Sequence, residues 1–254
     1  MKYPQIERLI EIVATLRSEN GCQWDREQTH QSLRPNMLEE AYEAVDAIDD
    51  NDMSNLREEL GDVLLQVVLH AQIAKDEGNF DIEDVAKELG DKLIHRHPHV
   101  FGNVEVHSTK EILDAWDRLK KEEKTDRKSI LDGISKSQSA LMSAQKISKR
   151  AIKVGFEWDS IESLKKCIES EYKEFEEAVQ MNDFDKMEDE MGDIFFATVN
   201  LARWYKIDSE QALLRANKKF IKRFKKMEEI ATKPLDEYSF EEFDCLWKQA
   251  KNLV

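Results

Sequence analysis

The sequence predicts an all-α protein built from two tandem modules, each resembling a four-helix bundle. Glycine and proline are scarce, at 8 and 4 of 254 residues, a composition that favours long helices over turn-rich sheets. Amphipathic helices joined by short loops pack antiparallel, so a bundle is expected. The short polar break at 51–54, with Ser54 as a candidate N-cap, separates two such helices. Apolar residues before that break recur at helical spacing, at Leu38, Ala41, Tyr42, Val45 and Ile48.

An internal repeat sets the expected module boundaries. Trp24-Asp25 recurs as Trp158-Asp159, and two acidic pairs follow in each copy. The sequence predicts an N-terminal module over 1–110 and a C-terminal module over 140–254. Residues 111–139 are predicted to be a linker that contains a charged helix near Trp116.

The overall charge argues against nucleic-acid binding, and the cysteines indicate the cellular compartment. With a net charge of −15, the chain is a poor general binder of nucleic acid, and phosphate chemistry here would need bound cations or a local basic patch. The three cysteines are isolated, which indicates a reducing compartment and a cytoplasmic location. No apolar run approaches the length of a membrane span.

The acidic pairs are the candidate metal ligands. Each pair has i, i+3 spacing, so its two carboxylates project from one face of a helix. Converging carboxylates repel one another unless a cation lies between them, and an all-oxygen set suits Mg²⁺, with Mn²⁺ as an alternative. A solvated acidic face is the plainer interpretation, although the second copy of the pattern favours a metal site. The N-terminal set is Glu40, Glu43, Glu59 and Asp62, and the C-terminal set is Glu171, Glu174, Glu190 and Asp193.

Basic residues near the end of each module are candidates for binding phosphate. Arg96 aligns with Arg223, and Lys92 with Lys219. A basic helical surface without a ligand is the alternative for each. His97 aligns with a phenylalanine, which favours packing over metal ligation.

Several motifs resemble the MazG family, and the resemblance covers nearly the whole chain. They span residues 22–30, 33–35, 38–43, 57–62 and 96–102. The resemblance implies an all-α nucleoside triphosphate (NTP) pyrophosphatase fold, a homodimer, and hydrolysis of NTPs to the monophosphate and pyrophosphate with Mg²⁺. It also implies that the C-terminal module is the main catalytic one.

The same resemblance implies roles for individual residues. The four C-terminal carboxylates are the expected catalytic and metal-binding residues, although Ser170 replaces the first Glu of the family's E-E-x-x-E motif. Lys219, Lys222 and Arg223 match the family's basic phosphate-binding stretch, and Trp247 matches the aromatic residue that contacts the nucleotide.

Two alternatives stay open from the sequence. One is a pyrophosphatase of narrow specificity, for example for dUTP or dCTP, which a panel of substrates would distinguish. The other is a nucleotide-binding regulatory or dimerisation scaffold in one or both modules. The sequence does not decide whether the N-terminal module is active.

Overall fold

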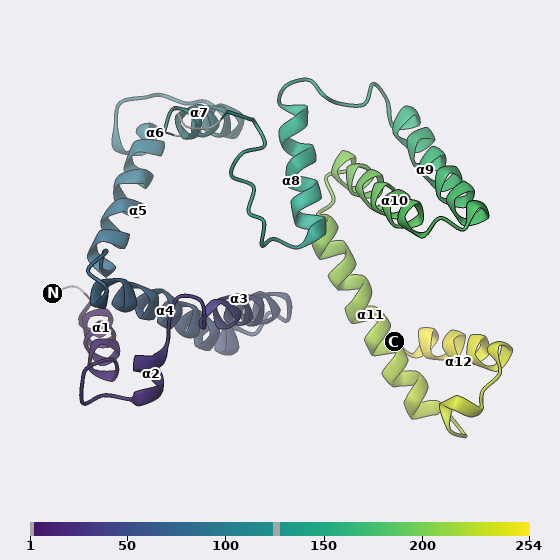
Figure 1. Ribbon diagram of the computed structural model, residues 1–254, viewed down its shortest axis with the longest axis horizontal. Coiled ribbons are helices and arrows are strands. Elements are labelled where there is room, and N and C mark those ends of the chain that lie inside the picture. Colours follow the sequence, from purple (N-terminus) through teal and green to yellow (C-terminus); the bar gives the residue numbers. More distant parts are fainter. Residues whose placement is uncertain (1–2, 124–127) are drawn as a thin grey trace. The chain divides into compact units, whose positions relative to one another are not determined.

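The computed structural model describes residues 3–123 and 128–254, and every regular element within those ranges is a helix (Figure 1). The predicted all-α class is confirmed. The chain divides into two compact units, Met1–Thr125 and Asp126–Val254, and each is described below by itself. Within the described residues, no helix is both long and apolar enough to cross a membrane.

The first unit, here called the N-terminal unit, is built around a long helical hairpin that α3 (Arg34–Asp49) and α4 (Met53–Asp76) form. Its core consists of Val13, Leu33, Val68, Leu69 and Ile73, which are all nearly inaccessible to solvent. The helices that supply and surround this core are α1 (Pro4–Leu16), α2 (Gln23–Glu27), α3 (Arg34–Asp49), α4 (Met53–Asp76), α5 (Ile82–Arg96), α6 (Pro98–Phe101) and α7 (Thr109–Glu122).

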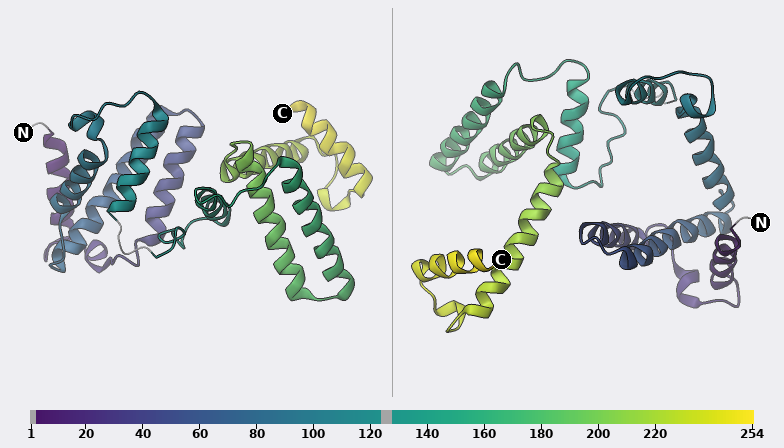
Figure 2. Two further views of the ribbon diagram at one scale, coloured as in Figure 1. Left: turned by 90° about the horizontal axis from the view of Figure 1, so that it is seen from above. Right: turned by 180° about the vertical axis from the view of Figure 1, so that it is seen from behind.

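The second unit, here called the C-terminal unit, repeats the hairpin. In the views of Figures 1 and 2, α9 and α10 lie side by side as an antiparallel pair. The elements of this unit are α8 (Ala140–Ile152), α9 (Ile161–Met181), α10 (Phe184–Trp204), α11 (Ser209–Ile230), the 3₁₀ helix η1 (Leu235–Glu237) and α12 (Phe240–Leu253).

The same Asn-Asp turn connects the two helices of each hairpin, which explains why this dipeptide is repeated in the sequence. Asn51 and Asn182 adopt positive φ angles of 55° and 51°, a conformation that asparagine tolerates better than most residues. The following Asp52 and Asp183 then cap α4 and α10 by accepting hydrogen bonds from backbone N–H groups. The cap of α4 is therefore Asp52, and the prediction of Ser54 was wrong by two residues.

The charged helix expected in the linker packs within the N-terminal unit. Helix α7 lies against α5, and its Trp116 makes an edge contact with His97 at a centroid distance of 4.8 Å. The C-terminal unit repeats this arrangement, since α12 packs on α11 and Trp247 contacts Phe220 at 5.2 Å. The repeat thus includes the last helix of each unit. Residues 124–127 of the predicted linker lie outside the described residues.

A pair of histidines distinguishes the N-terminal unit from its copy. The Nδ1 atoms of His30 and His70 are 2.8 Å apart and the two rings are stacked. Burial, followed by the neighbouring His30, lowers the pKa of His70. At the position in α10 that matches His70, the C-terminal unit has Leu201.

The His70 pair should make the N-terminal unit sensitive to acid. Because the folded pKa of His70 lies below its unfolded value of about 6.5, the unfolded chain binds more protons, and stability falls as the pH drops below about 6.5. A His70→Leu variant, which carries the residue of the other unit, should lose this dependence. Thermal unfolding of both proteins between pH 7.5 and 5 measures the difference, and parallel curves would refute the assignment.

Candidate functional site

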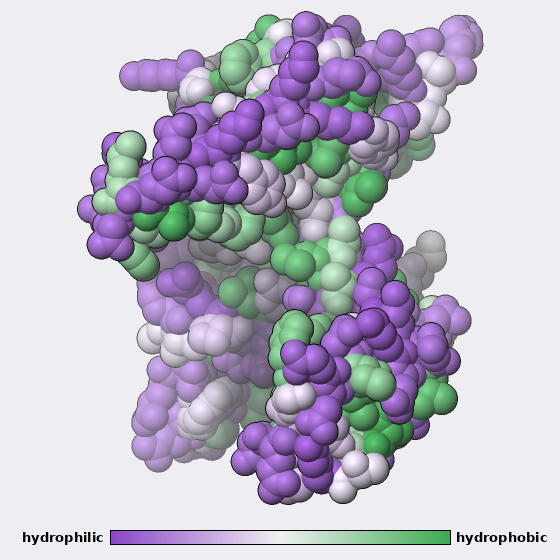
Figure 3. All heavy atoms as spheres, turned by 90° about the vertical axis from the view of Figure 1, so that its right-hand side faces the viewer, coloured by the Kyte–Doolittle hydropathy of each residue, from purple (hydrophilic) through white to green (hydrophobic). Residues whose placement is uncertain are grey.

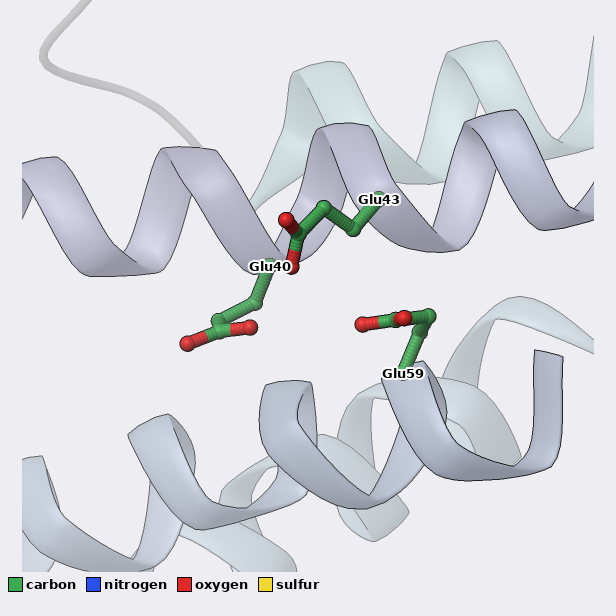
Figure 4. Close-up of side chains that lie close together, drawn as sticks. All are labelled: Glu40, Glu43 and Glu59. Carbon is green, nitrogen blue, oxygen red and sulfur yellow. The ribbon is translucent and has the colours of Figure 1, made fainter. Parts of the chain in front are cut away.

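Three carboxylates of the N-terminal unit converge between two helices. Glu40 and Glu43 project from α3 toward Glu59 on α4, as Figure 4 shows. One oxygen of each carboxylate lies within 4.8 Å of the other two. Glu40 and Glu59 are half-buried, whereas Glu43 is exposed. The i, i+3 spacing on α3 and the antiparallel hairpin therefore produce the convergence that the sequence predicts.

The C-terminal unit has the same cluster at the matching positions. Glu171 and Glu174 on α9 and Glu190 on α10 also bring one oxygen each within 4.8 Å of one another. Within the described residues, these two are the groups of three or more potential ligands that have such spacing. The fourth predicted carboxylate of each set, Asp62 or Asp193, lies beside its cluster and not within that spacing. Asp62 and Asp193 nevertheless interact electrostatically with Glu59 and Glu190, respectively.

The electrostatics of both clusters are those of uncompensated negative charge. Burial raises the pKa of Glu190, and the neighbouring carboxylates of Glu174, Asp193 and Glu171 raise it further. Burial and acidic neighbours raise the pKa of Glu59 in the same way. Every neighbour that contributes to these shifts is acidic. An all-oxygen set with unbalanced negative charge fits a hard divalent cation such as Mg²⁺.

The raised pKa of Glu190 leads to an expected effect of pH on stability without metal. Because this carboxyl binds its proton more tightly in the folded chain, its contribution to stability is full below the unfolded value of 4.5 and is lost as the pH rises through the folded pKa. A Glu190→Gln variant should therefore unfold at a higher temperature than the wild type at pH 7.5 in EDTA, and the two should converge near pH 4.

Added Mg²⁺ should reverse that order, because a cation stabilises the carboxylate form. Thermal unfolding at pH 7.5 with and without Mg²⁺ should show a larger rise for the wild type than for Glu190→Gln. Equal rises in the two proteins would contradict a metal site at this cluster.

A cavity of about 580 Å³ opens beside the C-terminal cluster. Glu171 and Asp193 form part of its wall, and Trp158 and Phe196 contribute aromatic surface. The remaining lining residues come from α8, α9, α10 and the segments before α8 and α9: Leu131, Ile147, Ser148, Ala151, Phe156, Glu157, Cys167, Ala197 and Asn200. The volume falls within the range of about 300–1,000 Å³ that is typical of small-molecule sites.

The repeated Trp-Asp motif helps to build this cavity wall. Asp159 accepts hydrogen bonds from Ser160 and Ser163 at the start of α9. Arg203 on α10 holds the adjacent loop by donating to both carboxylate oxygens of Glu157, at 2.8 and 2.7 Å. The repeat predicted the position of Trp158, but nothing in the sequence pattern indicated that Ser148 and Asn200 would reach the same cavity.

Cys167 lies at the junction of the cavity and the cluster. Its Sγ donates a hydrogen bond to Oε1 of Glu171 at 3.3 Å. Burial raises the pKa of the thiol to about 11, and the contact with Glu171 adds to the shift. The thiol is therefore protonated near neutral pH, and it orients a carboxylate instead of acting as a nucleophile.

The predicted phosphate-binding residues gather at a separate place on α11 and α12. Lys219 and Lys222 are exposed, and Arg223 lies over the ring of Trp247 at 5.8 Å. Helix α12 and the part of α11 that it covers lie apart from α9 and α10 (Figure 1). One chain therefore does not bring these four residues to its own carboxylate cluster. A direct contact of Trp247 with a nucleotide stays a prediction.

The two matching arginines differ in their partners. Arg96 is buried, pairs with Glu123 through both Nε and Nη2, and lies over Trp116 at 5.4 Å. No carboxylate pairs with Arg223 among the described residues, and its Nε is buried without a hydrogen-bond partner. Arg96, a phosphate-binding candidate from the sequence, is thus neutralised within its own unit, whereas Arg223 is available to an anion.

Comparison with known proteins gives consistent matches in both units. The model of the MazG nucleotide pyrophosphohydrolase domain matches residues 28–101 and again residues 159–228. A Thermotoga maritima protein named nucleoside triphosphate pyrophosphohydrolase/pyrophosphatase MazG is 47% identical over 249 residues, which cover 96% of this chain and 95% of that protein. The nucleoside triphosphate pyrophosphohydrolase of Escherichia coli K12 is 43% identical over 258 residues, with 97% of each chain covered.

Solved structures match as well. The crystal structure of a mazG-related protein from Thermotoga maritima aligns with a TM-score of 0.40 and 32% sequence identity, and the match covers 45% of this chain and 98% of that one.

Proposed function

Because the chain belongs to the MazG nucleotide pyrophosphohydrolase family, we propose that it hydrolyses nucleoside triphosphates to the monophosphate and pyrophosphate with Mg²⁺, and that Mn²⁺ can substitute. The observation that carries this proposal is the uncompensated three-carboxylate cluster beside a cavity of nucleotide size in the C-terminal unit. The cluster suits a cation that binds the triphosphate, and the adjoining cavity suits the nucleoside. The proposal extends to ribo- and deoxyribonucleotides in general, ATP included.

The proposed reaction is an attack of water on the α-phosphorus. A bond forms between the water oxygen and that phosphorus, and the bond from the phosphorus to the bridging oxygen breaks, so that pyrophosphate leaves. Glu171, Glu174 and Glu190, with Asp193 beside them, would hold Mg²⁺. The bound ion would neutralise phosphate charge and lower the pKa of the water. A carboxylate of the cluster that the metal does not fully engage would accept the proton of the water, and Glu190 is proposed for this role.

Cations are needed at the other end of the triphosphate. Arg223, with Lys219 and Lys222 on the same helix, would donate hydrogen bonds to the leaving pyrophosphate and offset its charge. The buried, unpartnered Nε of Arg223 supports this role, because a buried donor without a partner is costly unless a ligand supplies one. Trp247 would hold the guanidinium in place from its other side.

The contrast between the two units supports the C-terminal one as the main catalytic unit. The N-terminal unit keeps its carboxylate cluster, but its matching arginine is neutralised by Glu123. The apolar core of that unit also includes Leu69, at the position where the C-terminal cavity has Asn200. We therefore assign the N-terminal unit a cation site without turnover.

A homodimer would complete the site. Since α12 and the part of α11 that it covers lie apart from the cluster of the same chain, a second copy is the natural source of the basic residues (Figure 1). Hydrophobic patches interrupt the hydrophilic surface in Figure 3. The C-terminal unit exposes large aromatic side chains that a partner copy would cover, among them Phe156 at 81%, Phe184 at 76% and Phe240 at 83%. The unpaired state of all three cysteines supports a reducing, cytoplasmic setting.

Analysis of the reaction products tests the proposal. The purified chain is incubated with each ribo- and deoxyribonucleoside triphosphate and Mg²⁺, with and without EDTA, and the products are separated by ion exchange. Monophosphate and pyrophosphate that disappear with EDTA are the expected result. Diphosphate and phosphate would mean that a different bond is broken. Turnover that EDTA leaves unchanged would show that the reaction does not need a metal ion.

A further inference from the structure

Two buried polar side chains in the C-terminal cavity have no role in the chemistry described so far. Ser148 on α8 and Asn200 on α10 are only 4% and 6% exposed, and both line the cavity that Glu171 and Asp193 also line. Most of the other lining side chains are apolar or aromatic. A polar pair in such a wall costs free energy relative to apolar residues unless its hydrogen-bonding groups are used.

The hydrogen bonds between them fix what the pair presents to the cavity. Ser148 Oγ donates to Oδ1 of Asn200 at 2.6 Å, and Nδ2 of Asn200 donates to the carbonyl oxygen of Phe196 at 3.0 Å. Because these two bonds settle the orientation of the amide, one N–H of Asn200 and the lone pairs of the Ser148 hydroxyl stay without a partner among the described residues. The pair therefore offers one donor and one acceptor next to each other.

The N-terminal unit lacks this pair at the matching positions. Leu69 precedes Asn200 by the same interval that separates Glu59 from Glu190, and Ala14 precedes Ser148 by the interval between the two Trp-Asp motifs. Leu69 is 4% exposed and packs in the apolar core. The fold is therefore compatible with apolar residues at both places, and the polar pair is a feature of one unit alone.

We propose that Ser148 and Asn200 bind the hydrogen-bonding edge of the substrate's nucleobase in this cavity, an inference that rests on the proposed function. Adenine and cytosine each present an amino donor next to a ring-nitrogen acceptor, whereas guanine and uracil present a carbonyl acceptor next to a ring N–H donor. Each base thus offers one donor beside one acceptor, and turning the base over exchanges their order. Trp158 and Phe196 provide flat apolar surface for the ring in the same cavity. The pair therefore contributes affinity for every base and discriminates weakly among them.

Steady-state kinetics of a double variant test the proposal. Ser148→Ala/Asn200→Leu gives the cavity the residues of the N-terminal unit, and removing both partners together leaves neither one unsatisfied. The KM for ATP and for GTP should each rise about tenfold or more, with kcat within about twofold, because the lost contacts act equally on bound substrate and transition state. Ser143→Ala, on the same helix but not in the lining, is the matched control and should behave as the wild type.

Two further substrates separate the base from the sugar and the phosphates. With ribose 5-triphosphate, which has no base, the double variant should have the KM of the wild type. With purine riboside triphosphate, which lacks the amino donor of adenine, Ser148→Ala alone should add no further loss. An equal rise in KM for ribose 5-triphosphate would show that the pair binds the sugar, and a fall in kcat at constant KM would show that it acts on the cluster, so either result overturns the proposal.

The activity of the wild type shows which proposal a negative result refutes, the base-binding role or the proposed function. If the wild type hydrolyses NTPs and the correctly folded double variant keeps its KM, the base-binding role alone is refuted. If the wild type hydrolyses no nucleotide, the proposed function fails first. Circular dichroism and thermal unfolding of the double variant establish that it is folded.

Discussion

Replacing Glu174 with Gln should lower the turnover of nucleoside triphosphates by about a thousandfold, because loss of metal-based charge stabilisation is worth several kcal/mol in the transition state. Glu174 is exposed and lies on the surface of α9, so the helix should form as before. The measurement is the rate of pyrophosphate release at saturating Mg²⁺, together with the far-ultraviolet circular dichroism of the variant.

The N-terminal unit supplies the matched control for that experiment. Glu43 has the corresponding position on α3, is exposed as Glu174 is on α9, and belongs to the matching cluster of three carboxylates. Glu43→Gln should leave turnover within about twofold of the wild type, a difference that corresponds to less than 1 kcal/mol. Equal losses in the two variants would mean that both units are catalytic. Full activity of Glu174→Gln would refute the assignment of the C-terminal cluster.

The second large effect is expected from the two arginines, whose replacement should have opposite consequences. Arg223→Ala should lower turnover about a hundredfold, the usual scale for removing one group that stabilises transition-state charge. Its stability should change little, because Arg223 forms no ion pair within the described residues and the substitution removes only its contact with the Trp247 ring. Arg96→Ala should keep turnover but lower the unfolding temperature, since it leaves Glu123 without its buried partner.

The ion pair of Arg96 also predicts how the stability difference between the wild type and Arg96→Ala depends on pH. Hydrogen bonding to Arg96 lowers the pKa of Glu123, so the stability contributed by the pair is present above pH 4.5 and is lost as the pH falls through the folded pKa. The difference in unfolding temperature between wild type and Arg96→Ala should therefore shrink in acid. A loss of activity in Arg96→Ala and not in Arg223→Ala would reverse the roles given to the two units.

The features that could be predicted from the sequence are those that depend on local spacing. Helical periodicity and the scarcity of glycine and proline define the helices, and i, i+3 spacing places Glu171 and Glu174 on one face of α9. The short Asn-Asp connection forces antiparallel neighbours, which brings Glu190 opposite them. Because these causes are local and occur twice, the sequence was enough to anticipate both clusters.

The features that could not be predicted depend on contacts between residues far apart in the chain. Arg96 was interpreted as a ligand-binding cation, since nothing near it in sequence indicated the pairing with Glu123. The helix around Trp116 was assigned to a linker because its packing against α5 is tertiary. Ser148 and Asn200 meet across two helices, and each residue alone is unremarkable in a helical sequence.

The most direct test of the account is a crystal structure of the chain with Mn²⁺ and an α,β-methylene nucleoside triphosphate, whose bridging carbon resists cleavage. We expect an anomalous manganese peak among Glu171, Glu174 and Glu190, with the α-phosphate beside it and the base in the adjoining cavity. A nucleotide bound elsewhere, or a C-terminal cluster without manganese while the nucleotide is held by α11 alone, would contradict it.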